Sequence, residues 1–128
     1  MKALDTTFLI DLLNGQEETK QILQGKDPLF TTQINMYEII RGLFLAHAPS
    51  SKIAQIIHLF EEIRVLPLND AGIIQSAEIS SQLIHKGVKI PDNDCLIAGI
   101  LISHKINKIV TRNVSHFSRI PDLSVETY

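Results

Sequence analysis

Short apolar segments alternate with longer segments of helical periodicity along this chain, and that alternation limits the possible folds more than any other feature. The apolar segments have the length of strands, and the segments between them carry apolar residues at helical spacing. Strands separated by helices are typical of βα units, in which parallel strands form a sheet that helices cover on both faces. We therefore expect an α/β fold with a central, mostly parallel sheet, and a single domain over residues 1–128.

Residues that cap or break helices set the expected boundaries. Asn14-Gly15 ends the first helix, Thr32 is suited to cap the third, and Asp70 is suited to cap the fifth. Strands are expected at residues 1–4, 29–31, 64–68, 108–111 and 124–126. Helices are expected at residues 6–13 and 17–24, from 32 to about 46, at 52–62, from 70 to 87 and from 91 to about 105, with a turn or short helix after residue 111.

Three acidic residues stand against apolar sequence. Asp5 follows the first apolar segment, Glu38 lies inside an apolar helical segment, and Asp94 directly precedes the apolar residues 95–102. Burying a lone carboxylate is costly, and several carboxylates brought together repel one another unless a divalent cation neutralises them. Carboxylates and water suit Mg²⁺ or Mn²⁺. The first hypothesis is therefore metal-dependent phosphodiester chemistry.

The expected topology brings these residues to one edge of the sheet. Binding sites in such folds lie at the carboxyl ends of the strands. Asp5 follows one expected strand, Thr111 and Asn113 end or follow another, and a helix dipole favours Asp94 in a first helical turn. We expect Asp5, Glu38 and Asp94 to lie within metal-coordinating distance of a common point.

Composition excludes several function classes. A formal net charge of −2 argues against a domain that grips nucleic acid by bulk charge. One cysteine, Cys95, rules out an internal disulfide and suits a reducing cytoplasm. No signal-peptide pattern is present, and the longest apolar run, residues 95–102, is far short of the ~20 residues that cross a membrane. We expect a cytoplasmic protein that does not enter the membrane.

Four segments resemble, in order, the motifs of the PIN-domain ribonucleases. The first is LDTTFLIDLL, the second begins at Glu38 with EIIRGL, the third is PDNDCLIA and the fourth is TRNVSHF. Each motif alone is weak, but the ordered set spans nearly the whole chain. The small size of the chain, without an added domain, is similar to the VapC-type toxins of toxin–antitoxin pairs. The segments comprise residues 4–13, 38–43, 91–98 and 111–117.

The resemblance implies a Mg²⁺- or Mn²⁺-dependent endoribonuclease, the toxin of a type II toxin–antitoxin pair, which cleaves RNA phosphodiesters with a metal-activated water. It implies a homodimer held inactive by a cognate antitoxin protein. Apolar helix positions at 53–60 and 73–84 exceed what one small core needs, which also favours a homodimer. The implied catalytic and metal-binding residues are Asp5, Glu38 and Asp94, with Thr6, Thr111 and Asn113 in support.

His116 departs from the family pattern, which usually has an acid at this position. Imidazole binds Mn²⁺ but is a poor ligand for Mg²⁺. Three carboxylates and water can still hold one ion without it. His116 and Asp92 are therefore additional candidate metal ligands, although Asp92 is better placed as a helix N-cap.

Each main candidate also has a purely structural interpretation. Asp5 could only cap the following helix, Glu38 could only pair with Arg41, and Asp94 could only complement a helix dipole. Thr111 and Asn113 could hold their loop together through side-chain to backbone hydrogen bonds.

Three further residues have two interpretations each. Arg41 and Arg112 could touch RNA phosphates or pair with the site carboxylates. Asp11 is expected to face solvent or to cap a helix.

Other functions remain open. A PIN-like binding module for RNA or protein with a decayed site is one alternative, and His116 is the feature in its favour. An aspartyl phosphotransferase needs a second acid two residues after its nucleophile, whereas Asp5 is followed by Thr6-Thr7. A receiver-type phosphoacceptor needs an Asp after a middle strand, and residues 30–32 offer none.

Overall fold

The computed structural model describes residues 1–128 and contains one five-stranded sheet with the strand order β3-β2-β1-β4-β5. All four strand pairs are parallel, which confirms the expected α/β fold. The third expected strand ends two residues early, because Pro67 has no N–H to continue the ladder. The strands are β1 (Lys2–Leu4), β2 (Leu29–Thr32), β3 (Arg64–Leu66), β4 (Lys108–Val110) and β5 (Ser124–Glu126).

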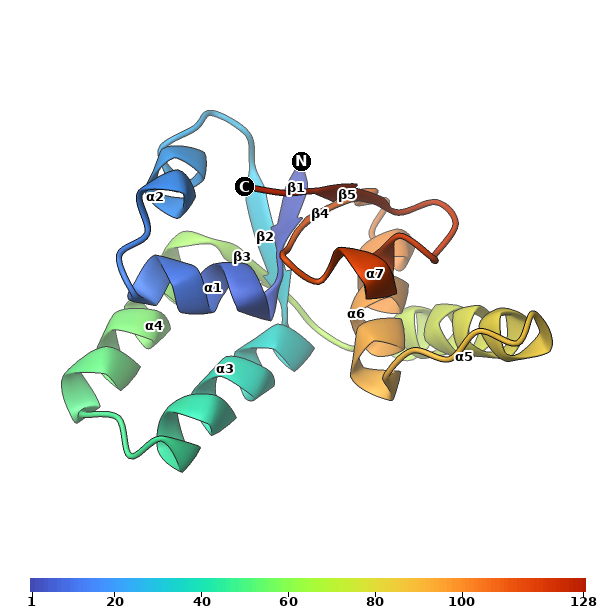
Figure 1. Cartoon of the computed structure of the whole chain (residues 1–128), viewed down its shortest axis with the longest axis horizontal. Coiled ribbons are helices and arrows are strands. Elements are labelled where there is room, and N and C mark those ends of the chain that lie inside the picture. The colour runs from blue at the N-terminus through green and yellow to red at the C-terminus, as the bar shows by residue number, and fades with distance from the viewer.

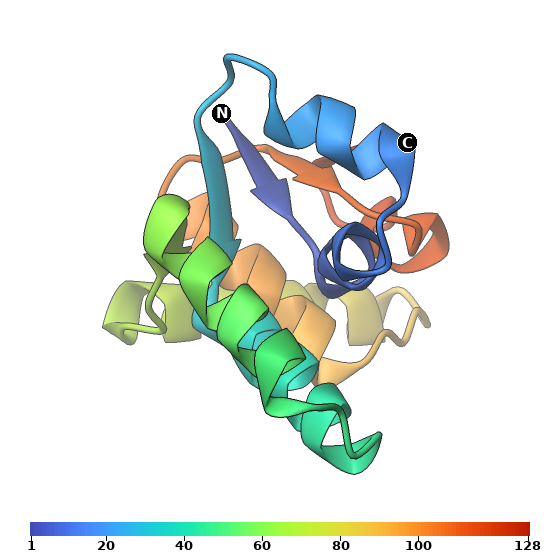
Figure 2. The same cartoon turned by 90° about the vertical axis from the view of Figure 1, so that its left-hand side faces the viewer.

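Seven helices cover the two faces of the sheet. In Figure 1, α1 to α4 lie on one side of the strands and α5 to α7 on the other. Figure 2, viewed from the first side, shows α4 and α1 in front of the sheet. None of these helices is both long and apolar enough to cross a membrane. The helices are α1 (Thr6–Leu13), α2 (Glu17–Leu23), α3 (Gln33–Leu45), α4 (Ser50–Glu62), α5 (Asp70–His85), α6 (Asp92–Ser103) and α7 (Val114–Phe117).

Two apolar cores follow from the alternation of side chains along the strands. Leu4 and Val110 point into the core beneath α1, α3 and α4, whereas Ala3 and Ile109 point into the core beneath α5, α6 and α7. The helix α6 is buried almost all round, which is typical of a central helix. Both faces of the short strands are therefore closed to water.

Local signals explain most helix boundaries, and two expected caps are wrong. Thr32 caps α3 in a reciprocal box with Asn35, as its sequence position predicts. Asn69, rather than Asp70, caps α5, because its side chain accepts from the backbone N–H of Gly72 at 2.9 Å. Asp92 makes no capping bond, because it is already the first helical residue and Pro91 stands in the N-cap position.

The depth of α6 is set by a close contact with α5. A Cβ at Gly99 would lie 1.9 Å from Ser76 Oγ and 2.8 Å from the carbonyl oxygen of Gly72. Ser76 is buried, and its hydroxyl donates to that same carbonyl at 2.7 Å. Because glycine alone permits this approach, the two backbones meet directly and fix the position of Asp94 at the start of α6.

We predict that Gly99→Ala destabilises the fold by about 3 kcal/mol or more, because the added methyl group must displace buried backbone. Gly42→Ala is the matched control: Gly42 is exposed on α3, and a Cβ there meets nothing within 4 Å. That variant should gain about 0.5–1 kcal/mol from helix propensity. Urea unfolding of both variants measures the difference, and equal stabilities would disprove the close contact.

Candidate carboxylate site

Asp5 anchors the candidate site at the carboxyl end of β1. It is only 4% exposed, and it occupies the N-cap position of α1 without making a side-chain cap bond. Its Oδ2 accepts from the Thr111 hydroxyl at 2.6 Å, and its Oδ1 accepts from Asn35 Nδ2 at 3.0 Å. These partners come from the end of β4 and from α3, so the Asp5 side chain joins these two elements rather than capping its own helix.

Glu38 approaches the same edge from α3. Its Oε1 accepts from the Thr6 hydroxyl at 2.7 Å, and its Oε2 lies 3.4 Å from Asn93 Nδ2 on α6. Asn35, one turn earlier on α3, also donates to the Thr6 hydroxyl at 3.0 Å. Glu38 is thus tied to α1 and α6 rather than paired with Arg41.

Asp94 lies in the first turn of α6 and is 7% exposed. Its Oδ2 lies 2.7 Å from His116 Nδ1, and Asn113 Nδ2 lies 2.8 Å from that same ring nitrogen. An ionised Asp94 only accepts, so Nδ1 donates to it when Nδ1 carries the ring proton, whereas Nδ1 without that proton would accept from Asn113. The dipole of α6 favours a carboxylate at this position. A carboxylate that only complemented the dipole would not need the specific contact with His116.

Thr111 links Asp5 to the loop after β4. The Thr111 side chain is fully buried, and besides donating to Asp5 its hydroxyl accepts from the backbone N–H of Asn113 at 2.9 Å. It also lies 3.1 Å from the Thr7 hydroxyl on α1. The loop is therefore held both by local bonds and by its contact with the buried carboxylate.

Burial dominates the electrostatics of the site, and repulsion between the acids adds a smaller contribution at Asp5. Burial is the main reason that the pKa of Asp5 rises to about 6; the bonds from Thr111 and Thr6 oppose the rise, and the negative charges of Asp94 and Glu38 add to it to a smaller extent. Burial also raises the pKa of Asp94, which the hydrogen bond and charge of His116 partly offset. The site thus gathers negative charge that it does not neutralise with a lysine or arginine of its own.

The donor chemistry suits a hard divalent cation, since all three acids offer carboxylate oxygens. As the side chains are arranged, however, no group of three or more His, Cys, Asp or Glu residues could hold a metal ion. The expected convergence of Asp5, Glu38 and Asp94 within metal-coordinating distance is thus absent from this structure. Glu38 and Asp94 are instead directed toward Thr6, Asn93 and His116. Asp92 is exposed and joins neither network.

Sequence reasoning missed three polar residues beside the site. Asn35 precedes Glu38 by three positions on α3 and Thr7 follows Asp5 by two, so helical spacing could have indicated both. Asp11 was expected to face solvent or to cap, and that is wrong: it is 3% exposed and pairs with Arg112. Arg112 therefore binds Asp11 rather than a site carboxylate, and Arg41 borders an apolar hollow on α3.

Comparison with known proteins agrees with the fold and the motif order. The PIN domain family matches residues 2–123. The tRNA(fMet)-specific endonuclease VapC of Salmonella typhimurium is 28% identical over 127 residues, which covers 98% of this chain and 96% of that protein. The chain belongs to the PIN-domain family, as its four motifs predicted.

Solved structures show the same architecture. VapBC2 of Rickettsia felis, bound to a DNA fragment from its promoter, is similar with a TM-score of 0.90 at 21% identity, over 99% of this chain and 98% of that one. DNA-bound VapBC of Salmonella typhimurium is similar with a TM-score of 0.87 at 25% identity, over 98% and 96% of the two chains. The fold is therefore that of a single PIN domain.

We predict that Asp5 makes the metal-free protein less stable as pH rises. Its folded pKa of about 6 exceeds the ordinary aspartate value of 3.8, so the folded state holds this proton more tightly. The resulting stability is present below about pH 4 and is lost as pH rises through about 6, by at most about 3 kcal/mol. Asp5→Asn removes the ionisation, so the stability of this variant should increase relative to that of the wild type as pH rises over this range.

Urea unfolding of both proteins at pH 4 to 7, in EDTA, isolates the contribution of Asp5 from other titrating groups. A stability difference between the two proteins that does not change with pH would contradict the raised pKa of Asp5.

Proposed function

We propose that this chain is a divalent-metal-dependent endoribonuclease that acts on RNA in the cytoplasm. The observation that carries the proposal is the buried, electrostatically strained Asp5, which stands at a strand end with Glu38 and Asp94 close enough to raise its pKa. The name of the VapC relative, an endonuclease specific for tRNA(fMet), supports RNA as the substrate.

Asp5, Glu38 and Asp94 are the residues that would hold Mg²⁺ or Mn²⁺, and to do so Glu38 and Asp94 would turn from Thr6, Asn93 and His116 toward Asp5. When bound, the ion supplies Lewis-acid chemistry, which lowers the pKa of water and offsets charge on a phosphodiester. Thr111 and Asn35 keep Asp5 oriented by donating to both of its oxygens. These donors are preorganised, so the carboxylate already has its orientation before substrate binds.

His116 we propose as the residue that orients Asp94. Its Nδ1 already faces Asp94 Oδ2, so the ring acts on the carboxylate whether or not Nε2 reaches a metal. The same contact accounts for a histidine where the family usually has an acid, because it keeps Asp94 in place. It also counts against a decayed site, because the three carboxylates are still present and hydrogen-bonded. The choice between Mg²⁺ and Mn²⁺ would then depend on the three carboxylates and not on the His116 ring.

We predict that Asp94→Asn abolishes RNA cleavage and leaves the fold intact or slightly more stable, because it removes one of the repelling charges. Asp70→Asn is the control, since Asp70 is an exposed acid in the first turn of another helix, α5. Cleavage of a tRNA pool with Mg²⁺, with Mn²⁺ and in EDTA, together with melting temperatures, tests both variants. Full activity of Asp94→Asn, or equal cleavage by the wild type in EDTA, would refute the assignment.

We further propose that the protein is a toxin with a cognate antitoxin and that it forms a homodimer. The similar VapBC structures and the VapC-like motifs support the antitoxin. For the dimer, residues 53–60 contribute less than expected, because Ile56, Leu59 and Phe60 lie in the core. Exposed apolar side chains remain on α5 and, unexpectedly, on α3: Ile73, Ile74, Ile84, Tyr37, Phe44 and Leu45.

The α3 surface is the stronger candidate for the dimer contact, because Met36, Tyr37, Ile40, Phe44 and Leu45 line one apolar hollow there. We predict a species of twice 14.3 kDa in light scattering at micromolar concentration. Phe44→Lys should reduce it to the monomer, and Ile57→Lys, at an exposed apolar position on α4, should not. A monomeric wild type would eliminate the dimer.

A further inference from the structure

A second buried carboxylate, Asp11, lies on α1 outside the candidate metal site. Its Oδ2 accepts from the Tyr128 hydroxyl and pairs with Arg112 Nε at 2.6 Å. Its Oδ1 lies 3.4 Å from Gln16 Nε2. A carboxylate that is 3% exposed is costly unless it is satisfied in this way, yet none of the proposed metal chemistry uses it.

Tyr128 is itself held in place. Its ring packs edge-on against Phe8, with centroids 5.2 Å apart and an interplanar angle of 80°. Burial and the hydrogen bond to Asp11 raise the pKa of Tyr128 to about 12, so its hydroxyl stays protonated and continues to donate. Asp11 and Tyr128 together form a rigid support for the Arg112 side chain.

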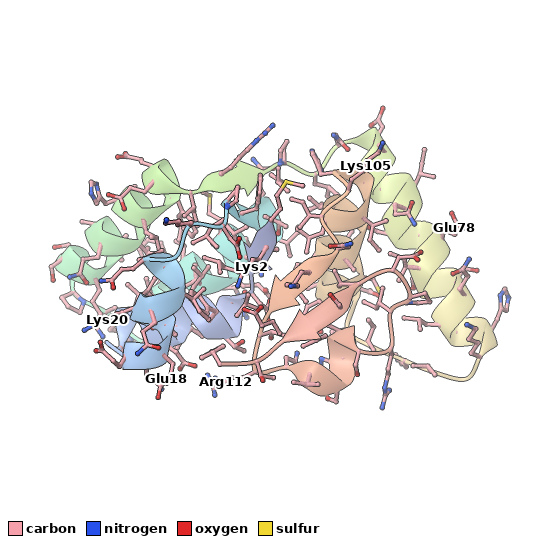
Figure 3. All side chains as sticks on the ribbon, turned by 90° about the horizontal axis from the view of Figure 1, so that it is seen from above. Lys2, Glu18, Lys20, Glu78, Lys105 and Arg112 are labelled. Atoms are coloured by element: carbon pink, nitrogen blue, oxygen red, sulfur yellow. The ribbon has the colours of Figure 1, made fainter.

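Arg112 is anchored at one end and open at the other. Its Nε is bound to Asp11 and its guanidinium also interacts with Tyr128, while the side chain as a whole remains 56% exposed and carries further N–H donors. Figure 3 shows Arg112 at the rim of the molecule. Because side-chain freedom has already been lost, a ligand that binds these N–H groups meets a preorganised fork.

A short chain of contacts connects Arg112 with the carboxylate site. The backbone N–H of Arg112 donates to the Thr7 hydroxyl at 3.0 Å, and that hydroxyl lies 3.1 Å from the Thr111 hydroxyl. Thr111 in turn donates to Asp5 at 2.6 Å. The backbone of Arg112 therefore adjoins the site, on the loop that also holds Asp5, and its guanidinium lies on Asp11, farther along α1.

RNA is a polyanion, so a site that carries three carboxylates needs a positively charged group nearby to bind it. The chain has a net charge of −2, and the site gathers three carboxylates, whereas nucleic-acid binding depends on local phosphate contacts by Arg or Lys. A guanidinium fork matches phosphate oxygens, and Arg112, whose backbone adjoins the site, presents one. Arg41, by contrast, borders the apolar hollow on α3.

We propose that Arg112 binds a backbone phosphate of the RNA adjacent to the one that is cleaved, and that Asp11 and Tyr128 are positioning residues that hold it there. The inference rests on the proposed ribonuclease function and adds the residues that place the substrate. It differs from a purely structural role, in which the cluster only ties the loop after β4 to α1.

The test measures binding of a single-stranded oligoribonucleotide as a function of salt, in the Asp94→Asn background, and steady-state cleavage in the otherwise native protein. Arg112→Gln should bind about tenfold more weakly at low salt, and the slope of log K against log salt should shrink by about 0.7, as expected for one lost phosphate contact on a single strand. In cleavage, KM should rise while kcat changes little, because a flanking contact binds ground and transition states alike.

Further variants separate positioning from folding. Tyr128→Phe keeps the packing on Phe8 and removes only the hydroxyl, so KM should rise by a smaller factor with the salt slope unchanged. Arg112→Lys keeps the charge but loses the fork, so it should retain the slope and bind less tightly; it carries the test if Arg112→Gln does not fold. Arg64→Gln, which removes an exposed arginine at the amino end of β3, is the control and should behave as the wild type.

The outcomes are distinct. An unchanged slope and KM in folded Arg112→Gln, or binding by Arg112→Lys equal to the wild type, would overturn the proposal and leave the cluster a structural tie. A wild type that neither binds nor cleaves RNA would instead overturn the ribonuclease function itself.

Discussion

The burial of the Asp5 carboxylate is the constraint on which the rest of the site depends. Asp5 stands where β1 ends, with donors from β4 and α3 on its two oxygens and the charges of Glu38 and Asp94 nearby. Each donor lowers the cost of burying the charge, and each neighbouring acid raises it. A pKa of about 6 means that burial and repulsion prevail. The fold thus keeps an unfavourable electrostatic energy at one edge of the sheet, and a bound cation would lower that energy.

The rest of the fold keeps this edge of the sheet in a fixed position. Apolar cores pack against both faces of the short strands. The helix α6 is buried because Gly99 allows its backbone to contact α5. Asp94, at the start of α6, is therefore placed by a glycine more than one helical turn away. The loop after β4 is placed in turn by Thr111 at the site and by Arg112 on Asp11. Binding residues on short loops gain precision from such rigid supports.

Much of this could be predicted from the sequence, and the misses share one cause. Apolar periodicity and caps predicted the strands and helices within one or two residues at most boundaries, and the spacing of Asp5, Glu38 and Asp94 along βα units predicted their common edge. Asp11 was missed because its partners, Arg112 and Tyr128, lie more than 100 positions away, and local patterns carry no information on such pairs. For the same reason the bond between His116 and Asp94 was not foreseen, whereas Asn35 followed a helical spacing that was available.

The central claim is that the strained carboxylates form a cation site, and the melting temperature under Mn²⁺ titration tests it most directly. At pH 7.5 the wild type should melt progressively higher with added Mn²⁺, with a gain of about 2.7 kcal/mol at one hundred times the dissociation constant. Asp5→Asn should start from a more stable metal-free state and show little further gain. No response of the wild type to Mn²⁺ or Mg²⁺, or an equal response in Asp5→Asn, would contradict the claim.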